Sequence, residues 1–304
     1  MFGHKSICKV KPTDVQKLYQ TMVSEAGVKP STAQKAHSII YQIFENAVMD
    51  NIIRTNPASN AFKSFRKTAE MSSESREPLT VEQQSQFIDY VYSSQVYCRL
   101  ANLFSVLIGT GMRIGEALGL RWCDCDFEEE IIHVTYALLY KRGENGKYRY
   151  RISKPKTKAG FREIPMFDEV KAALQREREK RHRVKTEFVV DGYSDFIFFN
   201  NNGQVYTQAF IYDTIQGIVT SYNNEGYARA VDEGREPRYL PKISAHILRH
   251  TFCTRMCENG VNLKVLQDIM GHRNIRTTME VYTKAMRDSK VEAIQALNGA
   301  FKIS

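Results

Sequence analysis

The amino-acid sequence predicts a mainly α-helical protein with a small antiparallel β-sheet, arranged as a helical domain followed by a larger mixed α/β domain. Apolar residues recur at helical spacing along most of the 304 residues, and alternation is confined to short stretches such as 131–140 and 147–152. Positive charge is concentrated at the start, where residues 1–67 carry ten Lys and Arg against four Asp and Glu. We therefore expect domains over 1–67 and 79–304, joined by a linker over 68–78.

The composition indicates a soluble, cytoplasmic protein with a polyanionic partner. Hydrophobic residues make up 42% and charged residues 25%, as in ordinary globular proteins. No apolar run is long enough for a transmembrane helix, and the first ten residues lack the apolar core of a signal peptide. Without a secretion signal, the six cysteines are expected to be reduced thiols. The formal net charge of +9 favours nucleic acid as a partner.

The first domain is expected to contain two or three helices. Pro12 is typical of a helix start, and Gly27 lies just past the expected end of that helix. A second helix is predicted from Ser31 to just before Pro57. It carries one broad apolar face: Ala36, Ile39, Ile40, Ile43, Phe44, Ala47 and Val48. The resulting core is small, and we expect a further helix to precede residue 2 in the complete domain.

The linker is predicted from the Ser-rich, charged stretch that ends at Pro78. Thr80 and Gln83 then have the spacing of a capping box at a helix start, and an apolar helix follows over 100–108. The alternating stretches 131–140 and 147–152, joined through Gly146, predict a β-hairpin, with a third strand over 162–166. Further helices are expected over 168–183, 207–222, 244–258, 262–270 and 276–297, and a surface insertion over 222–238.

The densest polar cluster lies in the expected helix that follows Ser244, a typical N-cap. His246, Arg249, His250 and Cys253 share one face of this helix, and Cys257 follows one turn later. A zinc site is disfavoured because four groups along one helix axis cannot surround a tetrahedral metal. The cluster alone is equally compatible with an ordinary amphipathic helix.

Arg113 and Glu116 form a second pair of interest. Three residues apart at a helix start, they are expected to form an ion pair, which most often only fixes a surface. Such a carboxylate can also orient a guanidinium so that its fork faces a phosphate. A lone tyrosine such as Tyr282, one turn inside the helix expected after His272, is by itself more typical of a core residue than of a catalyst.

A third feature is the basic segment between the predicted strands. Lys154, Lys156 and Lys158 alternate and would point the same way in an extended chain, ahead of Arg162. Such a segment is most often a solvated turn, but its shape also suits a DNA groove.

In combination these segments resemble the tyrosine recombinases of the phage integrase family, most closely the integrases of conjugative transposons. The similar motifs are TGMRIGEALGLRW (110–122), PKTKAGFREIP (155–165), HILRH (246–250), MGH (270–272) and VYTK (281–284). The resemblance covers nearly the whole chain. It implies a SAM-like helical core-binding domain and a mixed catalytic domain that ends in a tail helix. The catalytic set that it implies is Arg113, Lys156, His246, Arg249, His272 and Tyr282, with Glu116 in support.

The resemblance also implies the chemistry. Arg113 and Arg249 would bind the non-bridging oxygens of a phosphodiester and stabilise its transition state. The hydroxyl of Tyr282 would attack phosphorus and form a 3′-phosphotyrosyl link. His246 would accept the tyrosine proton and Lys156 would protonate the departing 5′ oxygen.

His272 would donate a hydrogen bond to the phosphate. The expected reaction needs neither a metal ion nor a cofactor, and the sequence contains no GxxxxGK[ST] loop.

The implied partner is double-stranded DNA at the attachment sites of a mobile element. The family implies a dimer on each site, a tetrameric synapse and an accessory excision factor. Candidate DNA-contact residues are Lys35, Arg54, Lys63, Lys158 and Arg162. A nicking-closing enzyme similar to type IB topoisomerases and a catalytically silent DNA-binding remnant remain alternatives.

Overall fold

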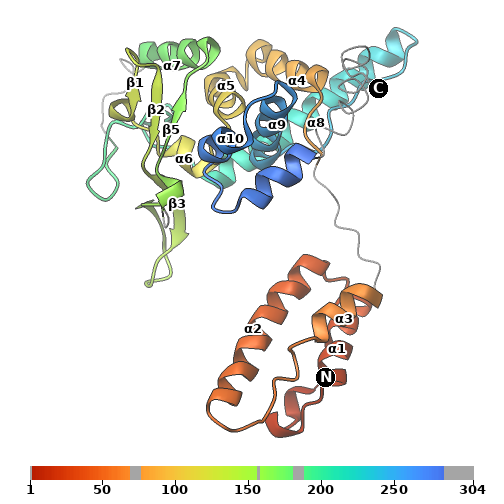
Figure 1. Cartoon of the computed structure of the whole chain (residues 1–304). Helices are drawn as coiled ribbons and strands as arrows, with labels where there is room; N and C mark the ends of the chain where they lie inside the picture. The colour runs from red at the N-terminus through yellow and green to blue at the C-terminus, as the bar shows by residue number, and fades with distance from the viewer. Residues whose placement is uncertain (1, 69–76, 156–157, 181–187, 284–304) are drawn as a thin grey trace, which may run out of the picture. The chain divides into compact units, whose positions relative to one another are not determined.

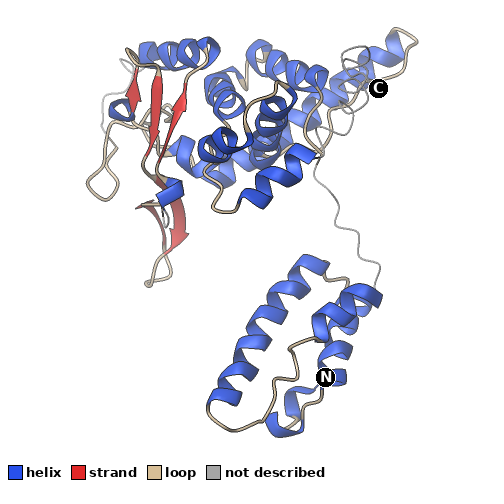
Figure 2. Ribbon diagram, viewed as in Figure 1, coloured by secondary structure: helices blue, strands red, loops and turns tan. Residues whose placement is uncertain are grey.

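The computed structural model describes residues 2–68, 77–155, 158–180 and 188–283 (Figure 1). The chain divides into two compact units, Met1–Ser75 and Arg76–Ser304, which are described separately. Most of the linker expected over 68–78 lies outside the described residues, as do the tail beyond residue 283 and Lys156. The mainly helical fold with small antiparallel sheets is confirmed (Figure 2).

The N-terminal unit is a small helical bundle. It begins with two 3₁₀ turns, Phe2–His4 and Ile7–Lys9, followed by α1 (Pro12–Gln20), which runs into a π-helical turn over Thr21–Glu25. The remaining helices are α2 (Pro30–Met49) and α3 (Ala61–Thr68). Their core is aromatic, with the ring of Tyr19 packed edge-on against Phe62 and its hydroxyl 2.9 Å from His37 Nδ1.

The broad apolar face expected on the second helix is only partly buried. Phe44 and Ala47 are buried, but Ile39 and Ile43 are 62% and 53% exposed. The helix also ends at Met49, several residues earlier than expected. Figure 1 shows α1 and α3 on the same side of α2. Among the described residues of this unit, the stripe through Ile39 and Ile43 stays exposed.

The larger unit is built around α5 (Ala101–Thr110), in which seven of the ten residues are buried. It packs against α4 (Val81–Ser93), α7 (Asp168–Lys180) and α9 (Ala245–Glu258), with α8 (Gln208–Asp232) and α10 (Leu263–Met270) completing the helical layer. The expected caps form. Thr80 Oγ1 accepts from Gln83 N at 3.1 Å, and Ser244 Oγ accepts from Ile247 N at 3.3 Å.

Two antiparallel sheets form, and the strand pairing differs from the expectation. The alternating stretch 131–140 divides into β2 (Ile131–Val134) and β3 (Ala137–Arg142), which belong to different sheets. The predicted hairpin is confirmed for β3 and β4 (Tyr148–Ser153). The third strand, β5 (Arg162–Pro165), pairs instead with β2, which also pairs with β1 (Cys125–Asp126). Figure 1 shows α7 beside this three-stranded sheet.

The surface insertion expected over 222–238 is largely wrong. Helix α8 continues without interruption to Asp232, and only the following residues form a loop. Asn223 anchors this loop because its side-chain amide exchanges hydrogen bonds with the backbone of Leu240, at 2.8 and 3.0 Å. The polar residues that suggest a break in the sequence lie on the solvent side of a long helix. No helix among the described residues is long and apolar enough to span a bilayer.

Candidate active site

Arg113 stands where α5 ends and a short helix, α6 (Ile114–Leu118), begins. Gly111 ends α5 in the left-handed conformation at φ +61°, and a Cβ there would lie 2.4 Å from the ring of Phe252. Glycine is therefore required at this turn. Arg113 then serves as the N-cap of α6 in extended backbone conformation, and its side chain is 42% exposed. The turn thus places a charged fork at the surface of the unit.

Glu116 is a buried carboxylate shared by two arginines. Its Oε1 accepts hydrogen bonds from Arg113 Nη1 at 2.8 Å and Arg162 Nη1 at 3.1 Å. Its Oε2 accepts from the Arg113 backbone N–H at 2.8 Å and Arg162 Nη2 at 2.7 Å. Burial alone would raise the pKa of Glu116, but the hydrogen bonds and charge of Arg162, together with Arg113, lower it to about 2. The carboxylate is therefore ionised at any physiological pH.

The C-terminal end of α10 is the second anchor of the site. The last carbonyls of a helix lack partners within the helix and carry its partial negative charge. Three arginines satisfy three consecutive carbonyls here. Arg162 Nε donates to Ile269 O at 2.6 Å, Arg249 Nη2 donates to Met270 O, and Arg113 Nη2 donates to Gly271 O at 3.2 Å.

Arg249 projects from α9 into this junction and is buried. Besides Met270 O, it donates from Nη1 to Gly111 O at 2.5 Å. Burial and the neighbouring Arg113 lower the pKa of Arg249 to about 9, so the guanidinium stays charged at neutral pH. A guanidinium has five N–H donors, so both Arg249 and Arg113 retain donors for a ligand.

His272 follows the left-handed Gly271 that ends α10. Its Nδ1 shares a hydrogen bond with Thr278 Oγ1 at 3.0 Å, which fixes the ring and leaves Nε2 for another partner. Burial, followed by the charges of Arg249, Arg113 and Arg162, lowers the pKa of His272 to about 4. The imidazole is therefore neutral near pH 7.

The lowered pKa of His272 has a measurable consequence for stability. Between pH 4 and 6.5 the unfolded chain binds a proton at this histidine and the folded chain does not, so stability is complete above pH 6.5 and is lost as pH falls towards 4. We expect His272 to account for a loss of about 2 kcal/mol in unfolding free energy between pH 7 and pH 5. Urea denaturation of the wild type and His272→Asn at both values measures it. Equal pH dependence of the two proteins would contradict the expectation.

Tyr282 lies in a helical segment over 275–283. Its half-buried side chain packs against a small apolar cluster of α9 and α10 that contains Phe252, Leu266 and Met270. The tyrosine is thus attached to the same two helices that carry Arg249 and the carbonyl anchor. His246 is exposed on the first turn of α9, one turn from the buried Arg249.

The other sequence candidates fall in different places. Lys156 lies outside the described residues, and of Lys158 only the backbone is described, at the start of a 3₁₀ turn over Lys158–Gly160. Lys35 and Arg54, like Lys63 on α3, are exposed on the N-terminal unit.

Arg162, for which the sequence predicts a DNA contact, lies inside the site and not on its surface. Its side chain is 4% exposed, and its guanidinium forms hydrogen bonds with Glu116 and with the end of α10. All three of its guanidinium nitrogens are bonded to these protein groups.

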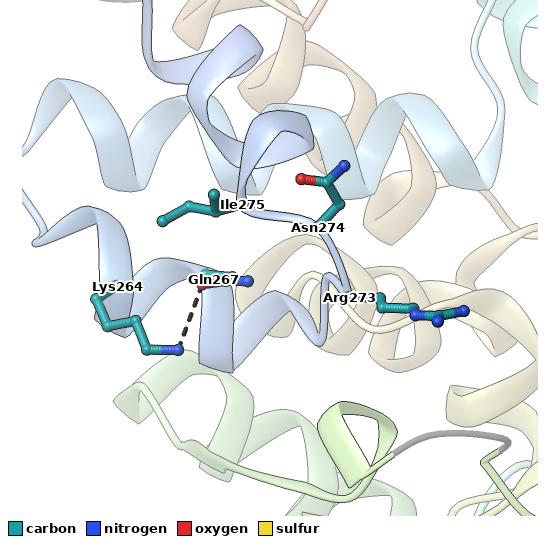
Figure 3. A pocket seen from close by; sticks show the side chains of 5 residues that line it. All are labelled: Lys264, Gln267, Arg273, Asn274 and Ile275. Atoms are coloured by element: carbon teal, nitrogen blue, oxygen red, sulfur yellow. Dashed lines mark hydrogen bonds between the residues drawn. The ribbon is translucent and has the colours of Figure 1, made fainter.

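An open hollow of about 730 Å³ lies along α10 and the loop that follows His272 (Figure 3). It is lined by residues of α10 and the following loop: Lys264, Gln267, Arg273, Asn274 and Ile275. Lys264 Nζ donates to Gln267 Oε1 at 3.3 Å and to Asp268 Oδ1 at 2.9 Å. The Arg273 side chain points away from Lys264 and Gln267 in Figure 3. The hollow thus adds exposed cations beside the site.

Sequence reasoning missed the groups that hold the site together. Thr278 orients His272, and the carbonyls of Gly111 and residues 269–271 orient the arginines. The sequence pattern at Thr277 and Thr278 predicts only a helix cap, and backbone carbonyls leave no trace in side-chain patterns. Among the described residues, no three His, Cys, Asp or Glu side chains converge as a metal site requires.

Comparison with known proteins places this geometry in a family. Residues 77–288 match the phage integrase family. The chain is 31% identical over 296 residues to the transposase from transposon Tn916 of Enterococcus faecalis, covering 97% of this chain and 68% of that protein. It is 26% identical over 310 residues to a XerC-like tyrosine recombinase of Caldanaerobacter subterraneus subsp. tengcongensis, covering 99% and 74%.

A solved structure extends the similarity to three dimensions. The Tn1549 transposon integrase, in complex with circular intermediate DNA, superposes with a TM-score of 0.82 and 32% sequence identity. The match covers 96% of this chain and 87% of that one. The family match over most of the chain and these relatives show that the chain belongs to the phage integrase family, the tyrosine recombinases that cut and rejoin DNA at specific sites.

Proposed function

We propose that this protein is the integrase of a mobile element, which excises and inserts the element by cutting and rejoining its ends through Tyr282. The observation that carries the proposal is the pair of catalytic forks. Arg113 and Arg249 are both held by the end of α10, directly before His272, and both keep free donors. Sequence similarity to transposon proteins supports the element as the substrate.

The arginine pair suits a phosphodiester because negative charge builds on the non-bridging oxygens as phosphorus becomes five-coordinate. Preorganised guanidiniums bind that charge without rearrangement, and their planar forks match two oxygens at a time. His272, neutral and fixed through Nδ1, contributes a hydrogen bond from Nε2–H to the same phosphate. Electrostatic stabilisation of this kind is often the largest contribution to catalysis.

Proton transfer completes the proposed step. Tyr282 loses its proton to His246 as the bond from its oxygen to phosphorus forms. The bond from phosphorus to the 5′ oxygen breaks, and Lys156 delivers a proton to that oxygen. The product is a 3′-phosphotyrosyl link and a free 5′ hydroxyl. Attack by the 5′ hydroxyl of a partner strand reverses each transfer, so the enzyme regains its starting state.

The proposed partners are duplex attachment sites and further copies of the same chain. The N-terminal unit, as a core-binding domain over 1–67, supplies phosphate contacts through Lys35, Arg54 and Lys63, which are all exposed. The catalytic domain over 79–304 supplies the chemistry. Two protomers bind each site, four form the synapse, and an accessory factor favours excision. The protein acts at the bacterial nucleoid.

A strand-exchange assay tests this function. On a supercoiled plasmid carrying both ends of the element in direct repeat, we expect two recombinant circles to appear without added metal ion. Relaxed plasmid without recombinants would instead indicate a nicking-closing enzyme. Retardation of the DNA without either product would indicate a silent DNA-binding remnant. A plasmid with only one end controls for non-specific nicking.

A further inference from the structure

We propose that Arg162 is a positioning residue for strand cleavage, which holds Glu116 and the end of α10 in the one arrangement that aims Arg113 and His272 at the phosphate. The inference rests on the catalytic roles proposed above. It assigns to Arg162 no contact with DNA. Its action passes through the groups that the guanidinium binds.

The first observation is the completeness of its hydrogen bonding. Arg162 makes a two-pronged contact with Glu116, at 3.1 and 2.7 Å, and its third nitrogen, Nε, donates to Ile269 O at 2.6 Å. All three guanidinium nitrogens therefore bind groups that in turn hold Arg113 or precede His272. Lysine offers one nitrogen and cannot reproduce this pattern.

The second observation is the tight fit around Gly271. This residue has φ +61°, and a Cβ on it would lie 2.9 Å from Ala159 O and 3.1 Å from Arg162 Cδ. The end of α10 therefore rests directly on the stem of Arg162 and on the backbone of the turn before β5. Pairing of Arg162 with Val134 fixes that stem to the three-stranded sheet. A displacement of the guanidinium is transmitted to the carbonyl that holds Arg113.

The third observation is the balance of charge. Arg113 from α6, Arg162 from β5 and Arg249 from α9 surround the single carboxylate of Glu116, and His272 lies beside them after α10. Without Arg162, the buried Glu116 keeps only Arg113 as a hydrogen-bonding partner, and its pKa rises because burial disfavours the charge. Protonation would then release Arg113. Without Arg162, the rate of strand cleavage should therefore fall at low pH, where Glu116 becomes protonated.

The test measures covalent capture of a nicked attachment-site DNA by the full-length protein in single turnover between pH 5 and pH 8. We expect Arg162→Met to be slower by about 100-fold at pH 7 while DNA affinity changes by less than about threefold. Its rate should fall more steeply towards pH 5 than the wild-type rate, which falls only as the proposed base His246 is protonated. Arg162→Lys should recover part of the rate. Glu163→Gln, an exposed neighbour on the same strand, serves as the matched control and should behave as wild type.

Three results would overturn the proposal. The first is a capture rate in Arg162→Lys that equals the wild-type rate at every pH. The second is a fall in the capture rate of Arg162→Met that is the same at every pH. The third is a fall in the capture rate that only follows the unfolded fraction of the variant, measured by circular dichroism. If Arg162→Met does not fold, the rate and pH profile of Arg162→Lys decide. Wild-type capture and its absence in Tyr282→Phe, run in parallel, separate failure of this proposal from failure of the catalytic assignment.

Discussion

Replacement of Tyr282 by Phe is expected to eliminate the covalent protein–DNA adduct, with a fall in capture of at least about 10⁴-fold. The substitution removes one oxygen, the proposed nucleophile, and retains the ring that packs against α9 and α10. Folding and DNA affinity should therefore stay close to wild type. Such a separation of chemistry from binding is the signature of a nucleophile and not of a core residue.

The measurement uses a DNA duplex nicked just downstream of the cleavage site, so that the short released strand diffuses away and the adduct accumulates. Wild-type protein should give a DNA-linked band on a denaturing gel in the presence of EDTA. Tyr227→Phe removes an exposed hydroxyl from α8 and serves as the matched control. If capture persisted in Tyr282→Phe, both the recombinase and the topoisomerase-like mechanisms through this residue would be wrong.

Replacement of Glu116 by Gln is expected to lower the unfolding free energy by about 3–5 kcal/mol, the usual cost of breaking a buried ion pair. The amide keeps the shape of the side chain but removes the charge that offsets Arg113 and Arg162. Glu82→Gln breaks an exposed pair with Arg238 and should change stability by less than about 0.5 kcal/mol. Chemical denaturation at pH 7 measures both.

The pH dependence of wild-type stability provides a second check on Glu116. Its folded pKa of about 2 lies below the ordinary value of 4.5, so the folded state releases its proton more readily. The stabilisation is complete above pH 4.5 and is lost as pH falls towards 2, with a total of about 3 kcal/mol. Glu116→Gln should lack this component. A variant that lost stability in parallel with wild type across this interval would contradict the ion-pair account.

The sequence was informative wherever spacing along one element decides the contact. Arg113 and Glu116, three residues apart at a helix start, form the ion pair that their spacing predicts. The same holds for the cap at Thr80 and for the hairpin around Gly146. In each case the partner lies within a few residues, so local geometry suffices.

Contacts between distant segments could not be predicted in this way. Arg162 looks like one more cation in a basic segment, and only the pairing of β5 with β2 and the position of α10 enclose it beside Glu116. The alternating pattern over 131–140 continues without interruption, although β2 and β3 within this stretch belong to different sheets. The alternation is the same in both strands, so it does not reveal where the chain passes from one sheet to the other. The catalytic roles of Tyr282, Lys156 and His246 rest on the family resemblance and stay predictions.

The three carbonyls at the end of α10 belong to a single helical turn, and this has a consequence for how the site is assembled. Unwinding that one turn would remove a hydrogen bond from Arg113, Arg162 and Arg249 at the same time, because each donates to a neighbouring carbonyl of it. The positions of the three arginines are therefore coupled through this turn. The effects on activity of substitutions at these three arginines should therefore be strongly non-additive.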